Sequence, residues 1–107
     1  MGKYIYLYRG PATSPDEMGP EATAEIMAAW EKWMGGLGSA LVDGGAPFGQ
    51  RTAVCDDGSS GTTTDLNGYT VVEAESLEAA QKHTQDHPFL SEGKGRFTLE
   101  VFELVPM

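Results

Sequence analysis

The first apolar stretch of the chain, KYIYLY, alternates strictly between two sets of side chains. In an extended backbone Tyr4, Tyr6 and Tyr8 would share one face, and Ile5 and Leu7 would share the other. The pattern predicts a β-strand with two apolar faces, each of which needs cover from water.

Further along, a helix is predicted by apolar residues that recur at spacings of four, three and four, namely Ile26, Trp30, Trp33 and Leu37. Glycines follow this stripe and end the helix. Before it, residues 14–17 (SPDE) have the form of a capping box, which predicts one short helical turn.

The rest of the chain predicts two strands, a helix and a last strand, over residues 39–54, 68–74, 76–87 and 96–105. The first of these strands is interrupted at Asp43, where Asp-Gly-Gly has the chemistry of a turn or a bulge. Ser76 is a helix N-cap. That helix should end at or before His87, because a proline follows it.

The predicted order β-α-β-β-α-β is that of the ferredoxin-like fold, an α+β class. Two helices would cover one face of a four-stranded antiparallel sheet, in a single domain of residues 1–107. We expect the tyrosines of the first strand to lie on the opposite face, without cover inside the chain. Because a large open apolar patch marks an interface, the sequence predicts a homodimer packed through the Tyr-bearing sheet face.

Charge and cysteine content narrow the function classes. Sixteen acidic residues against seven basic ones give a formal charge of -9, which disfavours nucleic acid and anionic membranes as partners. The apolar run at the N-terminus is too short for a signal peptide or a membrane span. One cysteine excludes an internal disulfide framework and fits a cytoplasmic protein.

Metal and cofactor motifs are weak. His83 and His87 stand four residues apart, but two imidazoles without a third donor are a poor metal site. Histidines in the last turn of a helix more often stabilise its negative end. The glycine-rich stretches lack the strand–loop–helix context of a phosphate cradle. We therefore expect neither a metal nor a cofactor.

Aromatic side chains supply the candidates for ligand binding. Trp30 and Trp33 are expected in the core, where a buried indole N–H needs a partner and one ring can line a cavity. With Tyr6 and Tyr8 they would form an aromatic-walled pocket for a flat or small apolar ligand. Asp43 could face that pocket, although Asp-Gly more often makes a turn.

The order of these elements, together with GYTVVEAESLEAAQKHTQDHP and the closing FTLEVFELVPM, resembles the YCII-related family, in particular its DGPF branch. The resemblance runs from end to end of the chain and is most specific from Gly68 to Pro88. It implies a ferredoxin-like fold, a dimer, and a pocket between the first helix and the sheet.

The resemblance also implies where chemistry would lie. Enzymatic members are thought to use a histidine and an aspartate as acid and base. In the polar loop CDDGSSGTTTD, Asp57 matches the aspartate of the DGPF motif, but serines replace its Pro-Phe. His87 matches the HP helix end, so His87 with Asp57 is the candidate catalytic pair. In the YCII-like branch the histidine lies on the first helix, and Met27 stands near that position here.

Three hypotheses follow, and the altered loop favours the first and the third. The chain is a dimeric binding protein for a small molecule, held between the first helix and the sheet. Alternatively, it is a cofactor-independent enzyme in which His87 and Asp57 carry out proton abstraction or elimination on a small substrate. The last hypothesis is a regulatory interaction module with a closed, filled interior.

Overall fold

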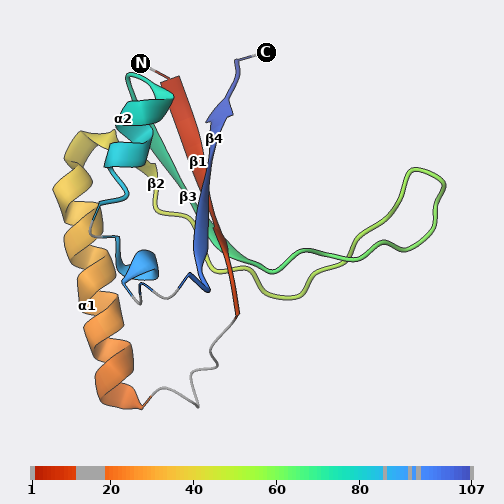
Figure 1. The fold of residues 1–107 in the computed structure, drawn as a ribbon, viewed down its shortest axis with the longest axis horizontal. Coiled ribbons are helices and arrows are strands. Elements are labelled where there is room, and N and C mark those ends of the chain that lie inside the picture. Colours follow the sequence, from red (N-terminus) through yellow and green to blue (C-terminus); the bar gives the residue numbers. More distant parts are fainter. Residues whose placement is uncertain (1, 12–18, 86, 92, 94, 107) are drawn as a thin grey trace.

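The computed structural model describes residues 2–11, 19–85, 87–91, 93 and 95–106. The elements are β1 (Gly2–Arg9), α1 (Pro20–Leu37), η1 (Gly38–Ala40), β2 (Leu41–Asp43), β3 (Leu66–Ala74), α2 (Leu77–Lys82), η2 (Pro88–Leu90) and β4 (Thr98–Leu104), where η marks a single 3-10 turn. The strands form one four-stranded antiparallel sheet in the order β2-β3-β1-β4. Figure 1 shows α1 and α2 on the same side of this sheet. The predicted α+β architecture is confirmed.

The tyrosine face of β1 points toward the helices, opposite to the expectation. Tyr4, Tyr6 and Tyr8 are 3%, 0% and 4% exposed, and they form the centre of the core with Trp33 and Val72. The prediction of an uncovered tyrosine face is therefore wrong. The tyrosines can be buried because two of their hydroxyls find hydrogen-bond partners inside the protein. Tyr6 donates to the carbonyl of Ala80, and the Tyr8 hydroxyl is hydrogen bonded to Thr70.

The other face of the sheet carries the second apolar set. Ile5 pairs with Val71 on one side and with Phe102 on the other, which puts all three on the face that points away from the helices. Phe102 is 50% exposed and Leu104, on the same face, is 40% exposed. In the described part of the chain no helix covers this face (Figure 1).

Helix α1 buries the predicted stripe only in part. Trp33 is buried, and Trp30 and Leu37 pack against the core, but Ile26 is 43% exposed. The helix begins at Pro20 and ends before Gly38, whose positive φ of 56° suits glycine. The predicted capping box lies outside the described residues. Helix α2 begins as predicted, with Ser76 Oγ accepting from the Ala79 amide, and ends well before His87.

Strand β2 is much shorter than predicted, because the chain leaves the sheet at the Asp-Gly-Gly segment. A Cβ on Gly45, where φ is +78°, would lie 1.6 Å from the Tyr69 carbonyl oxygen, so only glycine permits this approach. Asp43 Oδ1 accepts from the Gly45 amide and closes the bend. Beyond it, Pro47 forms an isolated bridge with Gly68, and the chain that follows, up to residue 65, forms an arm that extends past the sheet on the side opposite α1 (Figure 1).

Among the described residues, no helix has the length and apolar character needed to cross a membrane.

Candidate functional site

A cavity of about 450 Å³ lies where α1, the β2–β3 edge of the sheet and η2 meet. Helix α1 contributes Ile26, Met27, Trp30 and Met34, the strand β1 contributes Tyr8, and η2 contributes Phe89. Residues 44–47 and 67–69 complete the lining. The lining is therefore mostly apolar, and the volume of the cavity falls in the range of small-molecule binding sites.

Glycines leave space on the side of the cavity that the strands form, because they have no side chains to fill it. Gly68 stands opposite Tyr8 in the β1–β3 ladder, so no side chain from β3 fills the space beside the phenol. A Cβ on Gly68 would lie 3.0 Å from the Ala46 carbonyl oxygen, and the two backbones come together as an isolated bridge between Pro47 and Gly68. A Cβ on Gly44 would lie 3.7 Å from Met34 Sδ, in ordinary van der Waals contact, so these two residues approach each other closely at the edge of the cavity.

Tyr8 is the deepest polar group of the lining, and it belongs to a buried hydrogen-bonded chain. Its hydroxyl lies 2.7 Å from Thr70 Oγ1 and 3.0 Å from His87 Nε2. Thr70 Oγ1 donates to the Gly44 carbonyl at 3.3 Å. At the other end, His87 Nδ1 accepts from the Phe89 amide at 3.0 Å, which caps η2. Five groups thus connect η2 to the β2 edge behind the cavity wall.

His87 is packed among rings and held neutral. It is 1% exposed, and the ring centroids of Trp33 and Trp30 lie 4.0 and 4.7 Å from its own. Desolvation lowers the pKa of His87 from 6.5 to about 4. Because Nδ1 accepts from a backbone amide, the proton of the neutral ring is on Nε2, which donates to Tyr8. Burial likewise raises the pKa of Tyr8 far above its usual value.

Asp57 is not near this chain of groups. It is exposed and lies in the hairpin arm, where its Oδ1 accepts from both the amide and the hydroxyl of Ser59. These hydrogen bonds lower the pKa of Asp57. The arm extends away from the body of the molecule (Figure 1). The structure therefore does not bring His87 and Asp57 together, and the prediction that they pair within one chain is wrong.

The other predicted ligand-binding residues divide into two groups. Tyr8 and Trp30 line the cavity, while Tyr6 and Trp33 lie deeper in the core, 6.1 Å apart between ring centroids. Asp43 does not line the cavity: its Oδ2 accepts at 3.1 Å from the hydroxyl of Tyr69, whose side chain shares with Leu7 the sheet face that points away from the helices.

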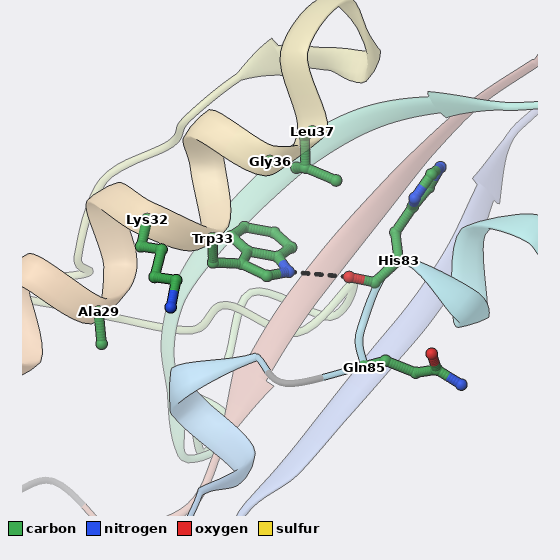
Figure 2. Close-up of a pocket in the computed structure, with 7 residues that line it drawn as sticks. All are labelled: Ala29, Lys32, Trp33, Gly36, Leu37, His83 and Gln85. Carbon is green, nitrogen blue, oxygen red and sulfur yellow. Dashed lines mark hydrogen bonds between the residues drawn. The ribbon is translucent and has the colours of Figure 1, made fainter.

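A second cleft, of about 520 Å³, opens on the other side of Trp33. Figure 2 shows the indole N–H of Trp33 directed at the backbone carbonyl of His83, a bond of 2.8 Å. The His83 imidazole extends away from that carbonyl, and Lys32 and Gln85 lie at the rim. No two of the side chains drawn there are hydrogen bonded to each other. The polar groups of this cleft therefore do not form an organised binding or catalytic site.

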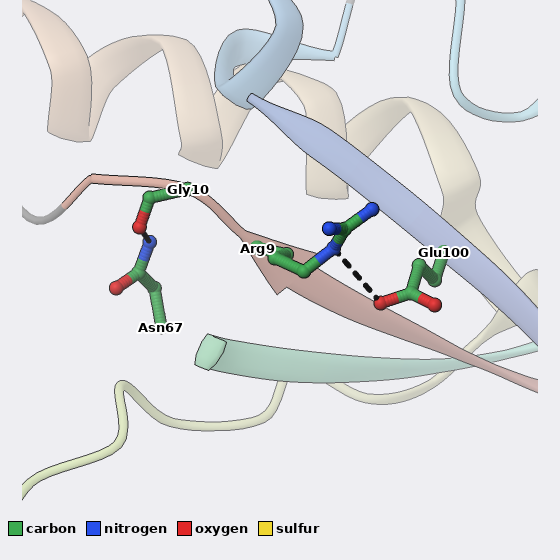
Figure 3. A network of polar contacts seen from close by, with 4 residues as sticks. All are labelled: Arg9, Gly10, Asn67 and Glu100. Atoms are coloured by element: carbon green, nitrogen blue, oxygen red, sulfur yellow. Dashed lines mark hydrogen bonds and ion pairs between the residues drawn. The ribbon is translucent and has the colours of Figure 1, made fainter. Parts of the chain in front are cut away.

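Sequence reasoning missed Thr70, Phe89 and Asn67. Thr70 shares the inner face with Tyr8 by alternation, but nothing in the sequence marks its contact with a phenol 62 positions away. Asn67 lines the cavity and donates through Nδ2 to the Gly10 carbonyl at 3.1 Å (Figure 3). Within the residues that the structure describes, no three histidine, cysteine or acidic side chains gather as metal ligands.

No model of a protein family matches the sequence, and no curated protein matches it. Among solved structures, the chain is similar to 5-chloro-2-hydroxyhydroquinone dehydrochlorinase from Burkholderia phenoliruptrix AC1100, in complex with 2,5-dihydroxybenzoquinone. The TM-score is 0.58 at 17% identity, over 96% of this chain and 93% of that one. At this identity the likeness shows a shared fold.

Proposed function

We propose that this protein binds a small, flat aromatic molecule in the cavity between α1 and the β2–β3 edge. The observation that carries the proposal is the cavity itself, walled by the rings of Tyr8, Trp30 and Phe89 and left open by glycines on the strand side. Planar rings gain from edge and face contacts with such a wall in addition to the burial of apolar area. The structurally similar dehydrochlorinase holds a quinone of that flat shape.

Binding is favoured over acid–base catalysis because the lining holds no group suited to proton transfer at neutral pH. None of the described residues that line the cavity is a carboxylate, an amine or an imidazole. Met27 lines it near the place where the YCII-like resemblance puts a histidine. His87, with its lowered pKa, has its basic nitrogen occupied by the Phe89 amide.

We further infer that the chain is a diverged member of the YCII-related family, in its DGPF branch. The sequence from Gly68 to Pro88 and the shared fold with the dehydrochlorinase support this. The open cavity argues for a binding protein and against an interaction module with a filled interior.

A cavity-blocking variant tests the binding proposal. Gly44→Val places methyl groups between the β2 edge and Met34, where a Cβ still finds ordinary contact at 3.7 Å. We expect one- and two-ring aromatic compounds to raise the melting temperature of the wild-type protein and to have little effect on Gly44→Val. Gly35→Ala, at a helix position with nothing within 4 Å, is the matched control and should respond as wild type does. Equal shifts in wild type and Gly44→Val would exclude the cavity as the site.

The homodimer remains our proposal, now through the face of the sheet that points away from the helices. Phe102 and Leu104 are half-exposed there and adjoin Ile5, Leu7 and Val71, and an apolar patch of this kind on a small domain marks an interface. The occupant is a second copy of the chain, because the face carries both charge signs. Lys3 and Arg9 lie on it with Glu73 and Glu100, so a two-fold related copy can meet each charge with its opposite. Arg9 Nε already lies 3.3 Å from Glu100 Oε2 (Figure 3).

Sedimentation of single variants tests this interface. We expect the wild-type protein to sediment at twice the chain mass and Phe102→Asp to sediment as a folded monomer. Leu77→Asp, at a position 52% exposed on α2, is the matched control and should remain a dimer. A wild-type protein that is monomeric at micromolar concentration would refute the interface.

A further inference from the structure

The cavity between α1 and the β2–β3 edge has a lining without charge. The described residues that line it are apolar, aromatic or glycine, together with one amide, that of Asn67, whose Nδ2 donates to the Gly10 carbonyl. The phenols stay neutral, because burial raises the pKa of Tyr8 and the hydrogen bond to Asp43 raises the pKa of Tyr69. A ligand that enters the cavity therefore leaves water without gaining an ion-pair partner from these residues.

Two basic side chains stand on the segments that build the cavity, and both are used elsewhere. Lys32, the basic residue of α1, lines the second cleft, on the other side of Trp33 (Figure 2). Arg51, near the base of the arm, donates through Nη1 to the carbonyls of Thr64 and Leu66. Neither belongs to the lining of the cavity.

Three backbone positions on the strand side of the cavity cannot donate to an anion. The Gly45 amide donates to Asp43 Oδ1 at 2.8 Å, and the Phe48 amide donates to the Asn67 carbonyl at 2.9 Å. Between them Pro47 has no amide hydrogen. Successive free N–H groups make backbone sites for anions in other proteins, and these three positions do not provide them here.

We propose that the cavity binds aromatic molecules in their uncharged form and excludes aromatic anions of the same shape. This inference rests on the proposed binding function, and it narrows the ligand to phenols and other neutral rings, in place of aromatic acids such as benzoate. An anion that enters loses hydration, and the lining offers no opposite charge to replace it. The formal charge of -9 adds repulsion at longer range.

Titration of 4-nitrophenol with the wild-type protein tests the proposal, because the anion of this compound absorbs visible light and its neutral form does not. The buffer is set at the pKa of the free compound, where half of it is ionised. We expect the protein to bind the neutral form more tightly by at least on the order of tenfold, so the anion absorbance falls and the apparent pKa of the bound compound rises by about one unit or more. An anion absorbance that rises, or that stays constant while equilibrium dialysis shows binding, would overturn the inference.

The control compound is 4-nitroanisole, which has the same ring but no hydroxyl to ionise. It should bind equally well on either side of that pH. If neither 4-nitroanisole nor 4-nitrophenol binds to the wild-type protein, the proposed function itself fails.

Met27→Lys is the decisive variant, because it adds one positive charge to the lining. Met27 lines the cavity and is 61% exposed, so a lysine of similar length can keep its ammonium group in water and still reach a bound anion. The apparent pKa of bound 4-nitrophenol should fall by about one unit relative to wild type. Ala28→Lys, at an exposed position of α1 outside the lining, is the matched control and should keep the wild-type value. An unchanged pKa in Met27→Lys, or an equal fall in both variants, would overturn the inference.

Discussion

Lowering the pH from 7 to 5 is expected to destabilise the fold through one residue, His87. The folded-state pKa of His87 is about 4 and the ordinary value is 6.5. Between these two values the unfolded chain binds a proton that the folded chain does not bind. The stability that a neutral His87 contributes is therefore complete above pH 6.5 and is lost as the pH falls toward 4.

The size of this effect follows from the same two values. Linkage between protonation and folding gives a loss of about 2 kcal/mol at pH 5 and about 2.5 kcal/mol at pH 4.5. Protonation would also remove the acceptor of the Phe89 amide, since a protonated Nδ1 cannot cap η2. The net charge of -9 acts in the opposite direction, because acid relieves repulsion among carboxylates.

A comparison of variants separates His87 from these background charges. His87→Asn keeps an acceptor near the Phe89 amide but does not titrate, so its unfolding free energy should lack the fall between pH 6.5 and 4.5. His83→Asn is the matched control, since the hydrogen bonds given for His83 run through its backbone, with its carbonyl accepting from the Trp33 indole and its amide donating to the Ala79 carbonyl, and it should follow wild type. Urea unfolding followed by tryptophan fluorescence measures all three. Parallel curves for wild type and His87→Asn, or an NMR titration of His87 near pH 6.5, would refute the reasoning.

Two further substitutions test the core and the bulge. Tyr6→Phe removes the buried hydrogen bond to the Ala80 carbonyl and leaves that acceptor unpaired. The free energy of unfolding in urea should therefore fall by about 1 to 3 kcal/mol. An unchanged free energy of unfolding would mean that this hydrogen bond does not stabilise the fold. Gly45→Ala should prevent β2 from pairing, because its Cβ would meet the Tyr69 carbonyl oxygen, whereas Gly58→Ala, with positive φ but open space, should cost only about 1 kcal/mol. Equal melting temperatures for these two alanine variants would contradict the close approach.

The order of helices and strands was predictable because apolar residues recur with a different period in each kind of element. The spacing from Ile26 to Leu37 is helical, and the alternation in β1 is that of a strand, so local sequence suffices for both. The choice between the two faces of β1 was not predictable in the same way, since both are apolar. It depends on where distant partners lie: the Tyr6 hydroxyl meets a carbonyl 74 positions away, and Tyr8 meets His87 across 79 positions.

The candidate site was predictable only in outline. Aromatic content pointed to Tyr8 and Trp30, and a pocket beside the first helix followed from the family resemblance. The position of Asp57 could not be predicted, because a polar hairpin loop has no apolar face that would tie it to the body of the protein. The Asp-Gly-Gly pattern predicted an interruption in the strand expected over residues 39–54, but it did not predict that the strand ends there, which depends on the contact of Gly45 with the backbone of β3.

The two indole N–H groups give the most direct test of the central claim, that an aromatic ligand occupies the cavity. Trp30 lines the cavity, whereas the Trp33 N–H is bonded to the His83 carbonyl on the far side of the ring cluster. In ¹⁵N-labelled protein titrated with hydroquinone, we expect the Trp30 indole resonance to shift saturably and that of Trp33 to move much less. A Trp30 resonance that stays fixed while hydroquinone binds, or a shift confined to Trp33, would contradict the account.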